Sequence, residues 1–86
     1  MKKIISILQP FDAEQTVIAY EDGNKIDAKK ISTANFAEEV CAFAVANDIH
    51  EINLGGAKQY GKGIARKIME TNLTNYNLDP LDVNLI

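Results

Sequence analysis

The chain has 86 residues, of which 47% are hydrophobic and 24% are charged. This balance is typical of a folded globular protein and excludes the charge-rich composition of disordered chains. The single cysteine, Cys41, excludes an internal disulfide and a cysteine-rich zinc site, and it suits a reducing compartment, so we expect a cytoplasmic protein. No apolar run approaches the roughly 18 residues of a membrane span. We therefore expect one soluble domain over residues 1–86.

The first third of the chain predicts three antiparallel strands. Residues 2–9 are apolar and β-branched, short enough for a buried strand, and Pro10 follows as a turn signal. Residues 15–20 form a second β-rich run, and Asp22-Gly23 then favours the positive φ angles of a tight hairpin turn. Residues 25–31 alternate well enough to return as a third, partly exposed strand.

A helix is predicted over residues 34–46, with Ser32 or Thr33 as its N-terminal cap. Glu38 and Glu39 suit the positive end of the helix dipole. The buried face is predicted from apolar residues at helical spacing: Phe36, Ala37, Val40, Cys41, Phe43 and Ala44.

The second half of the chain predicts a fourth strand, another helix and a last strand. Residues 51–54, Glu51-Ile52-Asn53-Leu54, are predicted to form the fourth strand, which stops at Gly55-Gly56. A helix over residues 59–71 follows, because its apolar residues recur at helical spacing. The asparagine-rich residues 72–80 are predicted to form a polar loop that leads into the strand 81–86. The apolar face of this helix is Ile64, Ala65, Ile68 and Met69.

The resulting order, β-β-β-α-β-α-β, predicts an α/β (α+β) fold with a five-strand mixed sheet, in which two helical crossovers add parallel strands. This order resembles the ribonuclease H-like fold over nearly all 86 residues. The metal-dependent nucleases of that family carry an Asp on the first strand, a Glu on the first helix and an Asp at the end of the fourth strand. Here Ile4-Ile5-Ser6-Ile7-Leu8 and Ile52-Asn53-Leu54-Gly55 offer no carboxylate. Because Glu38 or Glu39 alone cannot hold two magnesium ions, we expect no nuclease activity.

The segment Gly56-Ala57-Lys58-Gln59-Tyr60-Gly61-Lys62-Gly63 matches the glycines and lysine of the phosphate-binding pattern GxxxxGK[ST] and lies between a strand and a helix. Gly63 replaces the hydroxyl residue that ligates magnesium, which argues against a nucleoside triphosphatase. A weaker hypothesis remains, in which backbone N–H groups, a helix N-terminus and basic side chains hold a phosphate. Its residues are Gly55, Gly56, Lys58, Tyr60, Gly61, Lys62, Gly63 and Arg66.

Charge supports this hypothesis and also limits it. Residues 55–67 hold four cations and no acid, a charge of +4, so the rest of the chain carries −7 to give the net charge of −3. Exposed cations at a helix N-terminus cost about 0.3–1 kcal/mol each, and local rules are most often broken at functional sites. Solvated lysines with turn glycines produce the same pattern, and the overall acidity weighs against a nucleic-acid binder.

The sequence predicts a function without catalysis. His50 reads as a surface loop residue and Cys41 as a small core residue, and neither has a catalytic partner nearby in sequence, so we expect no enzyme activity and no cofactor. The favoured interpretation is a small protein-interaction or oligomerisation module that binds itself, as a homodimer, or another protein. A small core gains from association, and the last strand ends in Leu85-Ile86 with no polar tail. The alternative is a phosphate-recognising module, for a nucleotide or nucleic acid, on residues 55–66. No membrane partner is expected.

Overall fold

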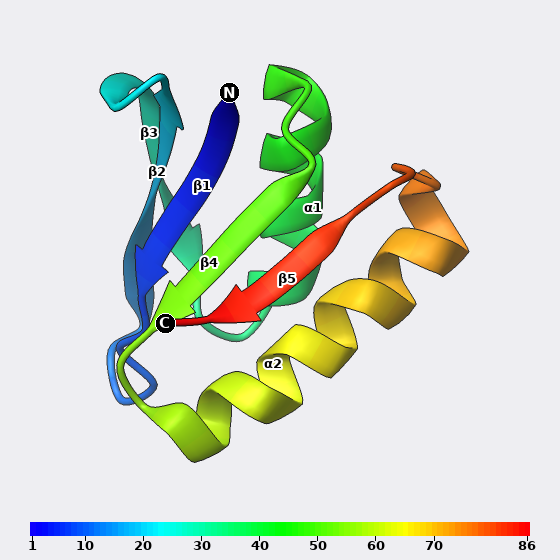
Figure 1. Ribbon diagram of the computed structural model, residues 1–86. Coiled ribbons are helices and arrows are strands. Elements are labelled where there is room, and N and C mark those ends of the chain that lie inside the picture. Colours follow the sequence, from blue (N-terminus) through cyan, green and yellow to red (C-terminus); the bar gives the residue numbers. More distant parts are fainter.

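The computed structural model describes residues 1–86 and contains one five-strand sheet, in the order β3-β2-β1-β4-β5, with two α-helices (Figure 1). It confirms the predicted α/β fold, the mixed sheet and the order of the elements. The resemblance to the ribonuclease H-like fold stays a prediction. The elements are β1 Lys2–Ile7, β2 Glu14–Glu21, β3 Asn24–Ser32, α1 Phe36–Asn47, β4 Glu51–Gly55, α2 Lys58–Thr71, the π-helical turn η1 Asn72–Tyr76 and β5 Asp82–Leu85.

The strands β1, β2 and β3 form the predicted antiparallel meander. The β2–β3 turn has positive φ at both central residues, 52° at Asp22 and 84° at Gly23, as the sequence predicted for a tight hairpin. Most of β3 is exposed, and Ile31 is its only fully buried side chain. The expected third, partly exposed strand is therefore confirmed.

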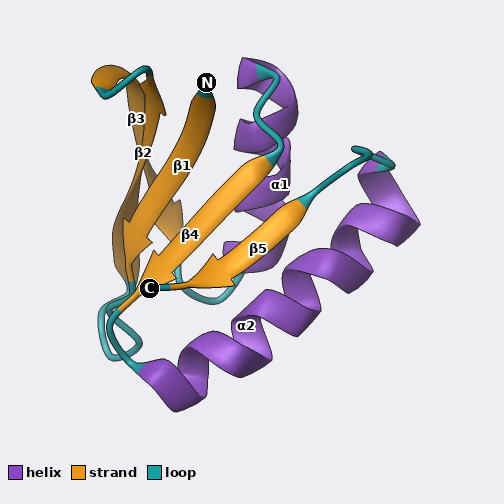
Figure 2. Cartoon of the chain, in the orientation of Figure 1, coloured by secondary structure: helices purple, strands orange, loops and turns teal.

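The two crossovers add parallel strands on the other side of β1. β4 pairs in parallel with β1, and β5 pairs in parallel with β4. In Figure 2, α1 lies behind the sheet and α2 lies along its β5 side, so neither helix crosses the sheet face turned to the viewer. The helices and the far sheet face share one core of 16 buried hydrophobic residues.

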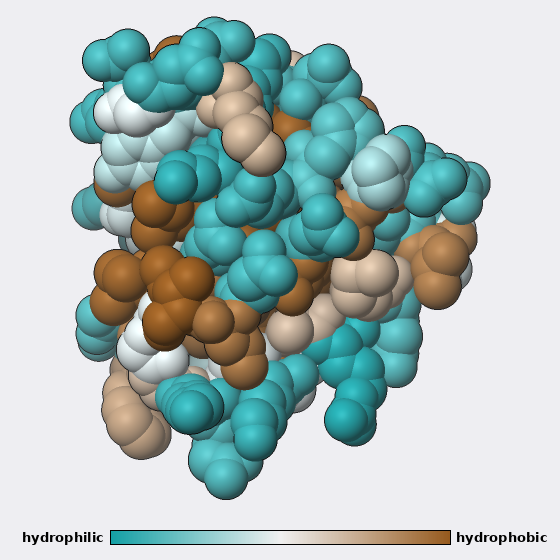
Figure 3. All heavy atoms as spheres, in the orientation of Figure 1, coloured by the Kyte–Doolittle hydropathy of each residue, from teal (hydrophilic) through white to brown (hydrophobic).

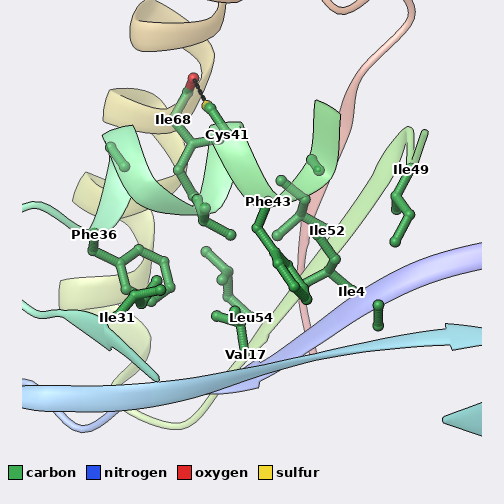
Figure 4. Packing of buried hydrophobic residues seen from close by; sticks show 14 of the residues in the cluster. Ile4, Val17, Ile31, Phe36, Cys41, Phe43, Ile49, Ile52, Leu54 and Ile68 are labelled. Carbon is green, nitrogen blue, oxygen red and sulfur yellow. Dashed lines mark hydrogen bonds between the residues drawn. The ribbon is translucent and has the colours of Figure 1, made fainter. Parts of the chain in front are cut away.

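The core confirms the predicted face of α1, since all six of its predicted apolar residues are buried. Figure 4 shows Phe36 and Phe43 packed against residues of the sheet. On α2, Ile68 is fully buried, whereas Ile64 is half-buried and packs at the margin of the core. Met69 is exposed, so its predicted place on the apolar face is wrong.

The predicted cap of the first helix is also wrong. The cap is Asn35, whose side chain makes no capping hydrogen bond, and the helix begins two residues later than predicted. Ser32 is still part of β3, where it pairs with Glu14, and the Thr33 hydroxyl donates to the Asp12 carbonyl. The two predicted caps are therefore held by the sheet and by the β1–β2 loop.

The segment predicted as a polar loop, residues 72–80, begins instead with η1, which continues α2. Asn72 is buried, and its side chain donates to Leu78 O at 2.7 Å and accepts from Leu78 N at 2.8 Å. Tyr76 donates to Glu38 Oε1 at 2.6 Å. These hydrogen bonds give a defined structure to an asparagine-rich stretch for which the local sequence predicts a loop. None of the helices combines the length and apolarity needed to span a membrane.

Candidate functional site

The glycine- and lysine-rich segment does not form a loop. α2 begins at Lys58, so Gly61, Lys62 and Gly63 lie within its first turns. The Gly61 N–H donates to Ala57 O at 2.8 Å, as a helix requires. Because the later N–H groups belong to the helix, only those of the first turn remain free for an anion. The cradle of glycine N–H groups around a phosphate, which the pattern suggested, is not present over Gly61–Gly63.

The glycines of this segment have identifiable structural uses. Gly56 turns the chain between β4 and α2 with φ of 71°. A Cβ at Gly61 would lie 3.1 Å from Leu85 Cδ2 and 3.4 Å from Leu8 Cδ1, so this glycine lets α2 approach the end of the sheet. Gly63 faces open space. Close packing and a tight turn therefore account for two of these three glycines without a ligand.

The basic side chains form a stripe along α2. Lys58, Lys62 and Arg66 are spaced four residues apart and are all exposed, which places successive members about 6 Å apart along the helix axis. Arg66 therefore lies about 12 Å along the axis from the helix start, too far to converge with Lys58 on one phosphate. Tyr60 is half-buried and packs against the core. Phosphate recognition on this segment stays a prediction, and its charges are spread along one helix face.

The start of α2 retains two features that suit an anion. It has no side-chain cap and no acidic residue in its first turn. The adjoining cavity, of about 350 Å³, is lined mainly by apolar residues. Such a lining offers a phosphate few hydrogen-bond donors. The lining residues are Leu54, Gly56, Ala57, Lys58, Leu85 and Ile86.

The acids of the first helix have structural partners. Glu38 accepts hydrogen bonds from Tyr76 and from Asn75, and it thereby fastens η1 to α1. Glu39 accepts from the backbone N–H of Ser32 at 3.1 Å and joins α1 to β3. No three side chains of His, Cys, Asp or Glu gather where they could hold a metal ion.

His50 and Cys41 are also tied into the structure. His50 lies between α1 and β4, with Nδ1 2.7 Å from Pro80 O and Nε2 3.2 Å from Asp48 Oδ1. The hydrogen bond to the Pro80 carbonyl, with smaller effects of Asp48, raises the pKa of His50 above 6.5. Burial, and to a lesser degree Glu38, raises the pKa of the Cys41 thiol to about 11, and its Sγ donates to Ile68 O at 3.6 Å (Figure 4). A thiol that holds its proton this firmly is a poor nucleophile.

The sheet face away from the helices, called the open face below, carries an unusual set of side chains. Ile5 pairs with Ile18 on β2, and Ile7 pairs with Gly55 on β4. Ile7 remains 54% exposed. Figure 3 shows hydrophobic side chains gathered over the ends of β1 and β4, next to the C-terminus. We define the apolar patch as Ile5, Ile7, Ile18 and Ile86.

A glycine of the phosphate hypothesis shapes this patch. A Cβ on Gly55 would lie 2.6 Å from Ile7 Cδ1 and 3.5 Å from Ile86 Cγ1. The missing side chain therefore lets both isoleucines lie against β4. Towards β2, a shallow groove of about 400 Å³ lies beside Ile7 and ends at Asp12 and Glu14.

Polar side chains occupy the open face over β4 and β5. Asn84 Nδ2 donates to Asn53 Oδ1 at 3.2 Å, and Asn53 Nδ2 donates to Glu51 Oε2 at 2.9 Å. Glu51 is also paired in register with Asp82, so two carboxylates stand opposite each other on neighbouring strands. Figure 3 shows hydrophilic side chains in teal next to the hydrophobic ones in brown on this face. We call Glu51 and Asp82 the acidic flank.

Lysines occupy the other side of the same face. Lys30 pairs with Thr16, and Lys25 pairs with Tyr20 next to the bulge in the β2–β3 ladder. Both are exposed. We call Lys25 and Lys30 the basic flank. The open face thus carries cations on β3 and carboxylates on β4 and β5, with the isoleucines between them and with Lys3 on β1 and Glu14 on β2 as further charges.

The chain matches no family model and no curated protein. Sequence reasoning missed the open face, although one signal was available. β1 is apolar on successive residues from Ile4 to Leu8, broken only by Ser6. Such a run is typical of a strand that is covered on both faces.

Proposed function

We propose that this protein is a non-catalytic protein-interaction module that binds through the open face. The observation that carries the proposal is that β1 is apolar on both faces but is covered by helices on only one. Ile4 is fully buried beneath the helices, whereas Ile7 on the opposite face is 54% exposed. The side chains of β1 suit burial on both faces of the sheet, but the helices cover only one face. A partner protein would cover the other face.

The character of the surface supports a protein partner. The patch is aliphatic, with Ile5 and Ile18 side by side, and its border is polar and charged. An apolar centre with a polar rim is the usual anatomy of a protein interface. The absence of a phosphate cradle on α2 and the structural use of Glu38, Glu39 and His50 favour this function over the alternative of residues 55–66.

Photo-crosslinking in the native host tests the proposal. A photoreactive phenylalanine derivative replaces Ile7 in one variant and Val45, an exposed apolar residue of α1, in a control. We expect protein adducts from position 7, of any mass, and few from position 45. Equal labelling from the two positions, or no protein adduct from position 7, contradicts a binding role for the open face.

A further inference from the structure

We propose that the partner of the open face is a second copy of this chain, packed sheet against sheet about a two-fold axis parallel to β1. This inference rests on the proposed function and adds the identity of the partner. It comes from the distribution of charge on the open face. Glu51 and Asp82 stand without an ion pair on the β4–β5 side of the apolar patch, and Lys25 stands without one on β3, at the opposite edge.

The acidic flank lacks a cation in its own chain. Glu51 and Asp82 are directly opposite in register, and like charges in that position destabilise a sheet. No Lys or Arg side chain lies within 4.0 Å of any carboxylate, since the only ion pairs involve the N-terminus and His50. Lys3 of β1 lies in the same row but forms no ion pair with Glu51, so the flank is open to a cation from a second copy.

The basic flank mirrors this arrangement. Lys25 and Lys30 are exposed on β3, at the opposite edge of the sheet from β5, and no acid pairs with either. Lys25 also lies in the same row across the sheet as the acidic flank. Lys25 pairs with Tyr20 on β2, and Tyr20 pairs with Lys3 on β1. Lys3 and Glu51 each come one residue before the paired Ile4 and Ile52, so Lys3 lies beside Glu51. Lys25 is therefore level with the acidic flank along the strands, whereas Lys30 is level with Ile7, nearer the other end of the face.

Symmetry selects the axis. A two-fold axis parallel to the strands reverses the order of strands across the face and keeps each position along them. It therefore places β3 of one copy over β5 of the other, with Lys25 facing Asp82 of the second copy. Ile5 and Ile7 of the central strand meet their own counterparts at the axis, and the two Lys3 side chains meet between the two Glu51 side chains. An axis across the strands would stack β3 on β3 and β5 on β5, so Lys25 would not face the acidic flank of the second copy.

Size also favours the use of the whole face. The chain extends 30 × 28 × 20 Å, so its broadest face offers at most roughly 800 Å², the share that one partner contributes to a standard interface. The apolar patch alone covers a fraction of this area. A stable dimer must bury the charged flanks as well, and their complementarity then sets the orientation of the two copies.

The first test measures the mass of the purified chain in solution. We expect sedimentation equilibrium to give twice the chain mass of 9.5 kDa at high concentration, and the single-chain mass on dilution. Ile7→Lys should raise the dissociation constant at least about tenfold. Val45→Lys, which adds the same charge at a similarly exposed apolar position, should leave it unchanged. Equal dissociation constants for both variants and the parent would contradict a dimer through the open face.

The second test addresses the axis and does not depend on the patch. Asp82→Lys and Lys25→Asp each create a like-charge contact and should weaken the dimer about tenfold, more at low salt than at high salt. The double variant exchanges the two charges and should restore the parent value to within about threefold. Both residues are exposed, so the fold should tolerate these changes. Single variants that weaken the dimer without rescue in the double variant would overturn the proposed axis.

The two proposals fail in different ways. If the purified chain stays monomeric up to about 1 mM while position 7 still forms adducts with another protein in the host, the second copy is wrong and the binding function stands. If position 7 forms no protein adduct, both are wrong.

Discussion

On β1, the two faces of the sheet differ in cover far more than in apolar content. On the covered face of β1, Ile4 lies in a core shared with both helices, whereas on the open face Ile5 and Ile7 have no helix above them. The chain therefore buries one apolar surface by itself and leaves a second one available. The hydrophobic pattern of β1 therefore supports the proposal that a partner covers the open face.

The largest expected effect comes from the covered face. Val40→Asp places an unpaired carboxylate in the core beneath α1, where Val40 is fully buried, and should cost several kcal/mol against a total stability of about 5–15 kcal/mol. We expect the variant to be unfolded by circular dichroism at room temperature. Val45→Asp, on the exposed side of the same helix, should melt close to the parent. A Val40→Asp variant that melts like the parent would disprove this assignment of the core.

Substitution of a glycine on the open face and of a glycine in α2 should have smaller effects, and the two should differ. Gly55→Ala puts a Cβ where Ile7 Cδ1 lies and should displace that side chain, which disturbs the patch and weakens association while the melting temperature changes by only a few degrees. Gly63→Ala meets no atom within 4 Å and should stabilise α2 by about 0.5–1 kcal/mol without effect on association. Thermal melts and sedimentation measure both. Equal association of the two variants would show that Gly55 does not shape the interface.

The basic stripe of α2 provides a test of phosphate binding, the function that competes with binding through the open face. Lys62→Glu replaces a base by an acid near the positive end of the helix, and stability should stay equal or rise by a few tenths of a kcal/mol. If the alternative function holds, the parent binds nucleotides or short oligonucleotides weakly and salt-sensitively, and this variant does not. Titration at low and moderate salt decides it. Absence of binding by the parent, or equal binding by both, removes the phosphate hypothesis.

The smallest effect concerns His50, at the end of the sheet where β4 begins. Its pKa is raised in the folded protein, chiefly by the hydrogen bond to Pro80 O, so its protonated form stabilises the fold. This contribution is complete below pH 6.5 and is lost as the pH rises through the folded pKa. The difference in unfolding free energy between parent and His50→Gln, measured by urea titration, should therefore shrink from about pH 6 to about pH 8. A difference that grows with pH would contradict the assigned hydrogen bonds.

Local patterns were sufficient for most of the fold. The Asp22-Gly23 pair fitted the hairpin because few residues accept positive φ, and the spacing from Phe36 to Ala44 defined the buried face of α1. The helix predicted over residues 59–71 was also correct, since α2 runs from Lys58 to Thr71. The phosphate pattern over the same residues misled, because its glycines at 61 and 63 lie inside that helix. The structural use of Gly61, which lets α2 approach Leu85 and Leu8, depends on residues that are distant in sequence.

The sequence by itself therefore determined the kinds and order of the elements, since φ preferences and hydrophobic periodicity act over a few residues. It also marked β1 as apolar on both sides. The tertiary structure decided which of those sides stays open, because that depends on where two long crossovers place their helices. It likewise brought Glu51 and Asp82 level with Lys25 across five strands, a juxtaposition that arises from strand register between segments far apart in the chain.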